Sequence, residues 1–398
     1  MVSGWLGVLV FGRLDHLVSL ARICRSIEFG LQIWTNDHLY IRLCKLKFQY
    51  QTMKRRSFLK TSLLSAGTFL AADQLLAASF KNSGPANKRE RMLQWLEGKS
   101  EPGYTPAAFF IHFDDKHKLG AAAASKHLEY FKYTNMDFVK IQYEQEYTPV
   151  DFLKRPSDWS KLNPRKLDFY EPQLEAVRQV VSATKKEALV VMTLYSPYMW
   201  AGHCATLPVL KRHLEEDPEA VKRGLNNLIE SQLLFVRACI KIGVDGFYMS
   251  TQGSEKDQFK DPRLFVNYVK PSDLVAMKEI SSTLPFNILH VCDFNAPYAS
   301  YDAVLDYPGQ VVNCNPQLTN KKLSLSEISS MFKRPCMGGM ERLGIMAKGT
   351  PSQIEAEARK VLKEAPRQFI LGADCTLPGD IDWDRVRQAI SVAHRFGS

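Results

Sequence analysis

One histidine and two cysteines stand out as potential metal ligands. His290 and Cys292 form a His-x-Cys pair, and Cys375 lies in a separate segment near the C-terminus. Each follows an apolar run of strand length, 286–289 for the pair and 369–371 for Cys375. One imidazole and two thiolates give zinc three protein ligands and leave one tetrahedral position open, which is typical of catalytic zinc sites. The sequence therefore predicts a catalytic metal site, provided that the fold joins the two segments.

The competing interpretation is a core histidine beside a buried cysteine, which is the commoner origin of an isolated His-x-Cys. The third cysteine and the strand-end position of all three residues favour the metal site. A second pair, His203-Cys204, follows another apolar run. We expect this pair to lie in a loop that covers the site.

Eight apolar runs of strand length alternate with helical patterns through the rest of the chain. They lie at 107–112, 136–142, 188–194, 244–250, 286–291, 310–313, 334–337 and 368–373. Their nearly continuous apolar character is expected of parallel strands buried on both faces. Eight such units over about 290 residues predict a single-domain α/β protein with a (β/α)8 TIM barrel. A doubly wound open sheet usually has fewer strands, and this chain lacks the Gly-rich first turn of that fold.

The helical patterns carry recognisable start signals. Thr350, Pro351 and Gln353 predict a capping box with proline at the first helical position, and apolar residues then repeat on one face from 354 to 365. The same reasoning predicts helices over 89–96, 171–185 and 218–242.

The carboxyl ends of barrel strands form the active site. His290 and Cys292 end the fifth predicted strand, and Cys375 follows the eighth, so all three should meet at one mouth. Other polar residues at strand ends are expected to line the same pocket: His112, Asp114, Gln142, Glu144, Tyr195, Gln252, Asn313 and Arg342. Arg342 is suited to a substrate carboxylate or phosphate, with a solvated loop residue as the equal alternative.

The first 80 residues differ from the rest. Residues 53–60 read Met-Lys-Arg-Arg-Ser-Phe-Leu-Lys, and a short apolar stretch and small residues follow. This order resembles a twin-arginine export signal, with an ordinary amphipathic helix as the alternative. We expect 1–52 to be an incorrectly assigned upstream extension, a genuine anchor being the weaker alternative. We further expect 53–80 to be the signal peptide, 81–88 a linker and 89–398 the barrel of a periplasmic protein.

Charge and cysteine usage narrow the function classes. The formal net charge is +10, of which the first 80 residues carry +6. The remaining Lys and Arg are not clustered, so nucleic acid is not expected as a partner.

The apolar part of the leader is too short for a stable membrane span. Cys239 falls in a helical pattern and Cys314 and Cys336 in strand-like runs, so we expect mostly free, buried thiols.

The C-terminal part of the chain contains Gly338-Gly339, Gly349-Thr350-Pro351 and Phe369–Gly372 followed by Cys375. With this block as its most specific part, the sequence resembles the uroporphyrinogen decarboxylase superfamily over nearly all of residues 88–397. Residues 136–140 and 243–247 are similar to the second and fourth strands of that family. The resemblance implies a TIM-barrel enzyme.

Two branches of this superfamily differ in their chemistry. One decarboxylates a tetrapyrrole without a metal, and the other contains zinc-dependent corrinoid:thiol methyltransferases with a His-x-Cys…Cys pattern. His290, Cys292 and Cys375 match the second pattern residue by residue. The Arg-rich N-terminal segment of the decarboxylases has no counterpart near 109–118. Asp374 departs from the family, in which a small residue usually precedes the last cysteine.

The resemblance therefore implies a Zn²⁺ cofactor and methyl transfer from a corrinoid to a small-molecule thiol. Because the chain has no corrinoid-binding domain, the corrinoid would come from a separate protein or as free cofactor. Two alternatives remain. One is a decarboxylase of uroporphyrinogen or a related carboxylated substrate, and the other is an exported protein that binds a tetrapyrrole or corrinoid without turnover.

Overall fold

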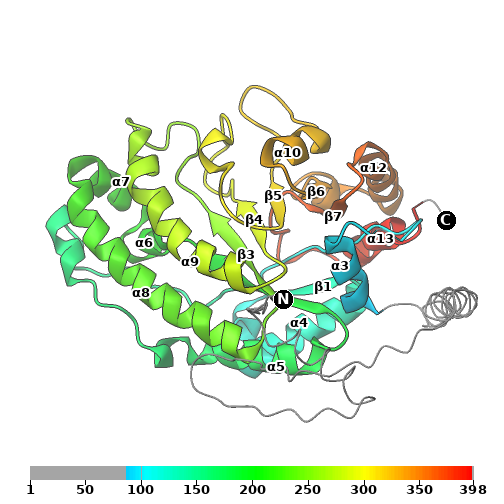
Figure 1. Cartoon of the computed structure of the whole chain (residues 1–398), viewed down its shortest axis with the longest axis horizontal. Coiled ribbons are helices and arrows are strands. Elements are labelled where there is room, and N and C mark those ends of the chain that lie inside the picture. The colour runs from blue at the N-terminus through cyan, green and yellow to red at the C-terminus, as the bar shows by residue number, and fades with distance from the viewer. Residues whose placement is uncertain (1–86, 100, 397–398) are drawn as a thin grey trace, which may run out of the picture. The chain divides into compact units, whose positions relative to one another are not determined.

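Seven parallel strands form one curled sheet and follow each other in chain order (Figure 1). The computed structural model describes residues 87–99 and 101–396. The strands are β1 (Phe138–Ile141), β2 (Leu189–Tyr195), β3 (Gly246–Thr251), β4 (Ile288–Val291), β5 (Val311–Cys314), β6 (Cys336–Met340) and β7 (Phe369–Ala373). Nearly all of their residues are buried, which confirms the interpretation of the apolar runs as parallel strands covered on both faces.

The first predicted strand, 107–112, is extended but does not form a regular strand. Ala107 makes an isolated parallel bridge with Leu371 of β7, and the backbone N–H of Asp137 donates to the Ala107 carbonyl over 3.0 Å just before β1. The N–H of Ala107 donates instead to the Asp137 carboxylate, at 2.7 Å. A side chain thus replaces part of the strand ladder. The segment still lies between β7 and β1, an arrangement consistent with a TIM-type barrel.

Helices connect the strands and lie outside the sheet (Figure 1). They are α3 (Lys88–Leu96), α4 (Gly120–Thr134), α5 (Glu171–Thr184), α6 (Pro197–Ala205), α7 (Leu207–Glu216), α8 (Pro218–Ile242), α9 (Lys270–Thr283), α10 (Leu325–Phe332), α11 (Ile345–Lys348), α12 (Pro351–Glu364) and α13 (Trp383–Ala393). The predicted capping box of α12 is present, because Thr350 and Gln353 exchange hydrogen bonds of 2.8 and 3.3 Å. None of the helices in the described part of the chain is long and apolar enough to span a membrane.

The pair His203-Cys204 lies in helix α6, so the prediction of a loop was wrong. Ser196 accepts a hydrogen bond from the Met199 N–H, and Pro197 occupies the first helical position. A cap followed by proline is a helix start signal, and it begins the helix directly after β2. Cys204 is fully buried.

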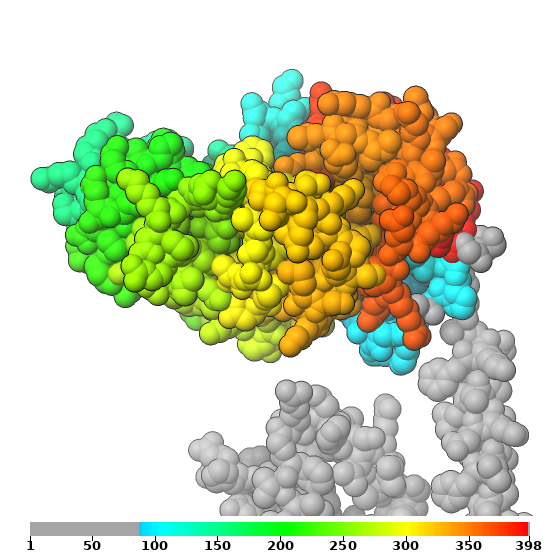
Figure 2. All heavy atoms as spheres, turned by 90° about the horizontal axis from the view of Figure 1, so that it is seen from above, coloured from blue at the N-terminus to red at the C-terminus, as the bar shows by residue number. Residues whose placement is uncertain are grey.

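The start and end of the described chain lie side by side. The Thr105 N–H donates to the Ala393 carbonyl at 3.1 Å, and the rings of Tyr104 and His394 stack with centroids 4.6 Å apart. In Figure 2 the cyan atoms near the start of this region adjoin the red atoms at its end. The described residues from 87 onward belong to one compact unit. The predicted extension (1–52), the predicted signal (53–80) and linker residues 81–86 lie outside the described residues.

Candidate metal centre

The fold brings His290, Cys292 and Cys375 together. One ligand atom from each residue lies within 4.8 Å of the others, and all three residues are buried. Cys375 Sγ and His290 Nε2 are 3.3 Å apart. His290 lies on β4, Cys292 directly follows that strand, and Cys375 follows β7. The strand ends therefore converge as expected from the barrel topology.

The spacing of the three ligand atoms fits a tetrahedral zinc ion. Bonds of about 2.3 Å to sulfur and about 2.0 Å to nitrogen place neighbouring ligand atoms roughly 3.5–3.8 Å apart. The distance of 3.3 Å between Cys375 Sγ and His290 Nε2 and the limit of 4.8 Å for all three pairs bracket that range. The donor set of two sulfurs and one imidazole is also one that zinc prefers. The residues therefore fit this metal without large rearrangement.

The His290 ring is held by stacking rather than by a hydrogen bond to its second nitrogen. Nδ1 is buried and has no hydrogen-bond partner among the described residues. The ring of Tyr248, on the neighbouring strand β3, stacks on it with centroids 4.8 Å apart and an angle of 26° between the ring planes. The Tyr248 hydroxyl donates to Asn313 Oδ1 at 2.5 Å. Asn313 in turn donates to the Met337 and Ala373 carbonyls, both at 2.9 Å, so four strands fix one ring.

The two cysteines differ in their readiness to ionise. The hydrogen bond from Cys292, together with the nearby His290 and Arg342, holds the pKa of Cys375 well below its ordinary value. The same hydrogen bond and burial raise the pKa of Cys292. Cys375 is therefore the more readily ionised of the two thiols, and a metal ion would favour the thiolate form of both.

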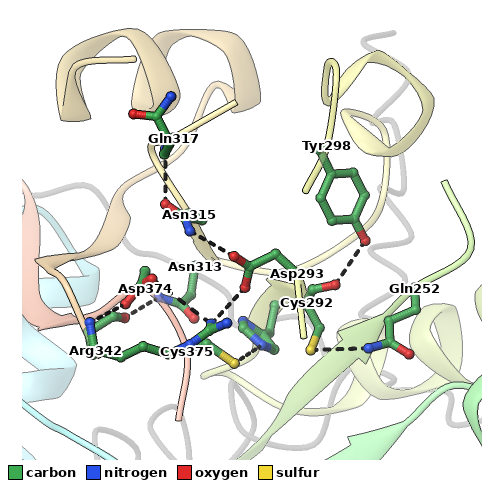
Figure 3. Close-up of polar contacts among 12 residues, drawn as sticks. Gln252, Cys292, Asp293, Tyr298, Asn313, Asn315, Gln317, Arg342, Asp374 and Cys375 are labelled. Carbon is green, nitrogen blue, oxygen red and sulfur yellow. Dashed lines mark hydrogen bonds and ion pairs between the residues drawn. The ribbon is translucent and has the colours of Figure 1, made fainter. Parts of the chain in front are cut away.

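Two further residues contact Cys292. Gln252 Nε2 donates to Cys292 Sγ at 3.4 Å, and Gln252 Oε1 accepts from Asn295 at 3.0 Å. The Tyr298 hydroxyl donates to the Cys292 carbonyl at 3.1 Å (Figure 3). The prediction that Gln252 lines the pocket thus corresponds to a direct contact with a candidate ligand.

Arg342 lies between two aspartates, of which Asp374 is buried and Asp293 is partly buried. Its Nη1 is 2.7 Å from Asp293 Oδ1, and its backbone N–H donates to Asp374 Oδ1 at 2.8 Å (Figure 3). Arg342 is therefore not a solvated loop residue. Because its guanidinium is paired with Asp293, it is also not free to bind a substrate carboxylate or phosphate. Burial raises the pKa of Asp374 to about 6, although Arg342 opposes this shift.

A second polar cluster follows β1 and the first extended segment. His112 Nδ1 lies 2.7 Å from Glu144 Oε1, and Gln142 Nε2 lies 2.8 Å from His112 Nε2. Gln142 also donates to the Tyr195 hydroxyl at 3.2 Å. Four of the predicted pocket residues thus form one network. Asp114 does not join it, because it is exposed and its carboxylate binds His117 at 2.6 Å.

Lys140 was not predicted as a site residue. It is only 4% exposed, and its Nζ lies 4.7 Å from the ring centroids of both Phe110 and Tyr248. Burial lowers its pKa to about 7, while Cys375, Glu144 and Cys292 act in the opposite direction. A lysine inside an otherwise apolar strand, Phe138–Ile141, is the signal that could have revealed it.

The chain belongs to the uroporphyrinogen decarboxylase (URO-D) family, whose model matches residues 139–396. This match covers well over half of the chain and includes the three candidate ligands. No curated protein matches the sequence.

Two solved structures resemble this chain at low sequence identity, and the first of them shares its fold. A methyltransferase from Methanosarcina mazei is 13% identical with a TM-score of 0.61, over 79% of this chain and 100% of that chain. A putative vitamin-B12 independent methionine synthase from Listeria monocytogenes is 14% identical with a TM-score of 0.46, over 73% of this chain and 97% of that chain. At such identities the likeness concerns the fold alone.

Proposed function

We propose that this protein binds Zn²⁺ through His290, Cys292 and Cys375 and transfers a methyl group from a corrinoid to a substrate thiol. The convergence of these three buried side chains within 4.8 Å is the observation that carries the proposal. Two thiolates and one imidazole leave one metal position for a substrate. Membership of the URO-D family supports an enzymatic role.

The residues around the proposed zinc site contribute in different ways. Bound zinc would lower the pKa of a thiol that takes the open position, so that the substrate is present as thiolate at neutral pH. Tyr248 holds the His290 ring, and Gln252 donates a hydrogen bond to Cys292. Lys140, in its protonated form, would add a buried positive charge that offsets the negative charge of the thiolates. The overall exchange would break the cobalt–carbon bond of the methylcorrinoid and form a sulfur–carbon bond. The cobalt would keep the bonding electron pair as Co(I), and the thiol proton would be released.

The corrinoid would be supplied by another protein or as free cofactor. We also propose that the chain is exported by the twin-arginine route after folding and loading with zinc, on the basis of residues 53–60. Detection of the mature protein in a periplasmic fraction, and its loss when the pair Arg55-Arg56 is changed to lysines, tests this part.

The reaction can be tested with methylcobalamin as donor and 2-mercaptoethanol as acceptor, followed through the absorbance of the corrinoid. The wild type should transfer the methyl group, and chelation should abolish transfer until zinc is restored. Cys375→Ser should be inactive under all conditions. Cys336→Ser is a matched control, because Cys336 is also a buried strand cysteine but lies outside the cluster. Zinc-independent transfer would contradict the proposal.

Decarboxylation is the second candidate, and the family to which the chain belongs favours it. A metal-free decarboxylase would need cations in the barrel mouth for the substrate carboxylates, yet Arg342 is already bound to Asp293. Turnover of uroporphyrinogen that survives strong chelation would establish this alternative. A chromophore that is retained without loss of methyl or carboxyl groups would instead indicate a binding protein.

A further inference from the structure

Arg342 connects the two chain segments that carry Cys292 and Cys375. Its Nη1 lies 2.7 Å from Asp293 Oδ1 and 3.9 Å from Asp374 Oδ2, and its backbone N–H donates to Asp374. Each aspartate is the sequence neighbour of one cysteine. A single residue after β6 therefore holds the end of β4 to the end of β7 (Figure 3).

This connection is shielded from water. The side chains of Arg342, Asp293 and Asp374 are 13%, 10% and 6% exposed. Asn315, which follows β5, donates a further hydrogen bond of 2.7 Å to Asp293. If one partner of this network is removed, a charge stays buried without a counter-ion, and this is strongly destabilising. The largely buried pair therefore holds the two strand ends together more firmly than an exposed pair would.

We propose that Arg342 is a positioning residue that keeps Cys292 and Cys375 within reach of one ion, even before metal binds. Arg342 donates its hydrogen bonds to Asp293 and Asp374 and not to the sulfur atoms. It therefore acts on the cysteines through these two aspartates. Without the guanidinium, two largely buried carboxylates would repel each other, and the ends of β4 and β7 would separate. This proposal rests on the proposed zinc site.

Zinc affinity of the full chain, measured by competition with a chromogenic chelator, gives the first test. Arg342→Ala should bind zinc about 10–100-fold more weakly than the wild type, the range found when partners of metal ligands are removed. Arg342→Lys keeps the charge without the planar fork and should fall between the two. Arg334→Ala is the matched control, because Arg334 precedes β6 and donates to the Phe332 and Gly309 carbonyls at the other end of the strand.

A second measurement separates this inference from zinc binding itself. In metal-free protein, the alkylation rates of individual cysteines are compared by peptide mass spectrometry, with buried Cys239 of α8 as internal reference. Arg342→Ala should speed alkylation of Cys292 and Cys375 by about tenfold through easier local opening, and leave Cys239 unchanged. Unchanged rates at both cysteines would overturn the inference. If Arg342→Ala speeds alkylation but the wild type binds no zinc, Arg342 does hold the two cysteines together, and the proposed metal site is wrong.

Discussion

His290 Nε2 and Cys375 Sγ lie 3.3 Å apart, although the two residues are 85 positions apart in the chain. The contact joins the end of β4 to the segment after β7, and Cys292 completes the cluster. Such an arrangement is costly for a core that only packs, because it buries an imidazole whose Nδ1 has no hydrogen-bond partner among the described residues. A metal ion gives these groups a common partner.

The stacking of Tyr248 on His290 should matter more for metal binding than the Tyr248 hydroxyl. Tyr248→Phe keeps the ring but leaves Asn313 Oδ1 without its hydrogen bond, which should cost about 1–3 kcal/mol of stability. Its zinc affinity should stay close to that of the wild type. Tyr248→Leu removes the ring and should weaken zinc binding. Urea unfolding and chelator competition measure the two effects, and equal zinc affinities for both variants would exclude a role for stacking.

Asp273 should make stability depend on pH. Burial raises its pKa from 3.8 to about 7, although Thr251 and Tyr307 donate hydrogen bonds to its carboxylate. The folded protein therefore keeps a proton that the unfolded chain loses. This contribution is complete below about pH 4, falls as the pH rises and is lost above about pH 7, a change of about 4 kcal/mol.

Asp273→Asn should lack this decline, so its stability relative to the wild type should rise between pH 4 and pH 7. Urea unfolding of both proteins at several pH values measures the difference. The pKa of buried Glu255 is also raised to about 7, and this effect cancels in the comparison. Parallel pH profiles would show that Asp273 is ionised in the folded protein.

The ion pair that ties α3 to the sheet should stabilise the fold. Arg89 makes two hydrogen bonds of 2.7 and 2.9 Å with Asp245, which is largely buried and also accepts from the Val190 N–H. Arg89→Ala leaves this carboxylate without its cation and should cost about 3 kcal/mol in urea unfolding. Arg91→Ala, on the same helix, breaks an exposed pair with Glu101 and should cost less than about 1 kcal/mol. Equal losses for the two variants would contradict this view.

The strands and the three clustered residues could be predicted because their signals are local. Apolar runs mark strands buried on both faces, and in a parallel barrel all carboxyl ends lie at one mouth. The positions of His290 and Cys375 therefore followed from chain order alone. The first extended segment, by contrast, shares its hydrogen bonds with the Asp137 side chain, and no periodic pattern in the sequence contains that information.

The partners of the cluster could not be predicted for a similar reason. Whether Arg342 meets a substrate or an internal carboxylate depends on how the loops after β4, β6 and β7 approach each other. The same holds for the stacking of Tyr248 on His290, which requires the register between β3 and β4. Lys140 alone carried a local signal, as a charged residue in a buried strand.

Metal analysis of the purified full chain tests the central claim most directly. After incubation with zinc and removal of the excess, the wild type and Cys336→Ser should each retain one zinc ion per chain, and Cys292→Ser and Cys375→Ser should retain almost none. Equal zinc content in all four proteins, whether high or near zero, would contradict a metal site formed by His290, Cys292 and Cys375.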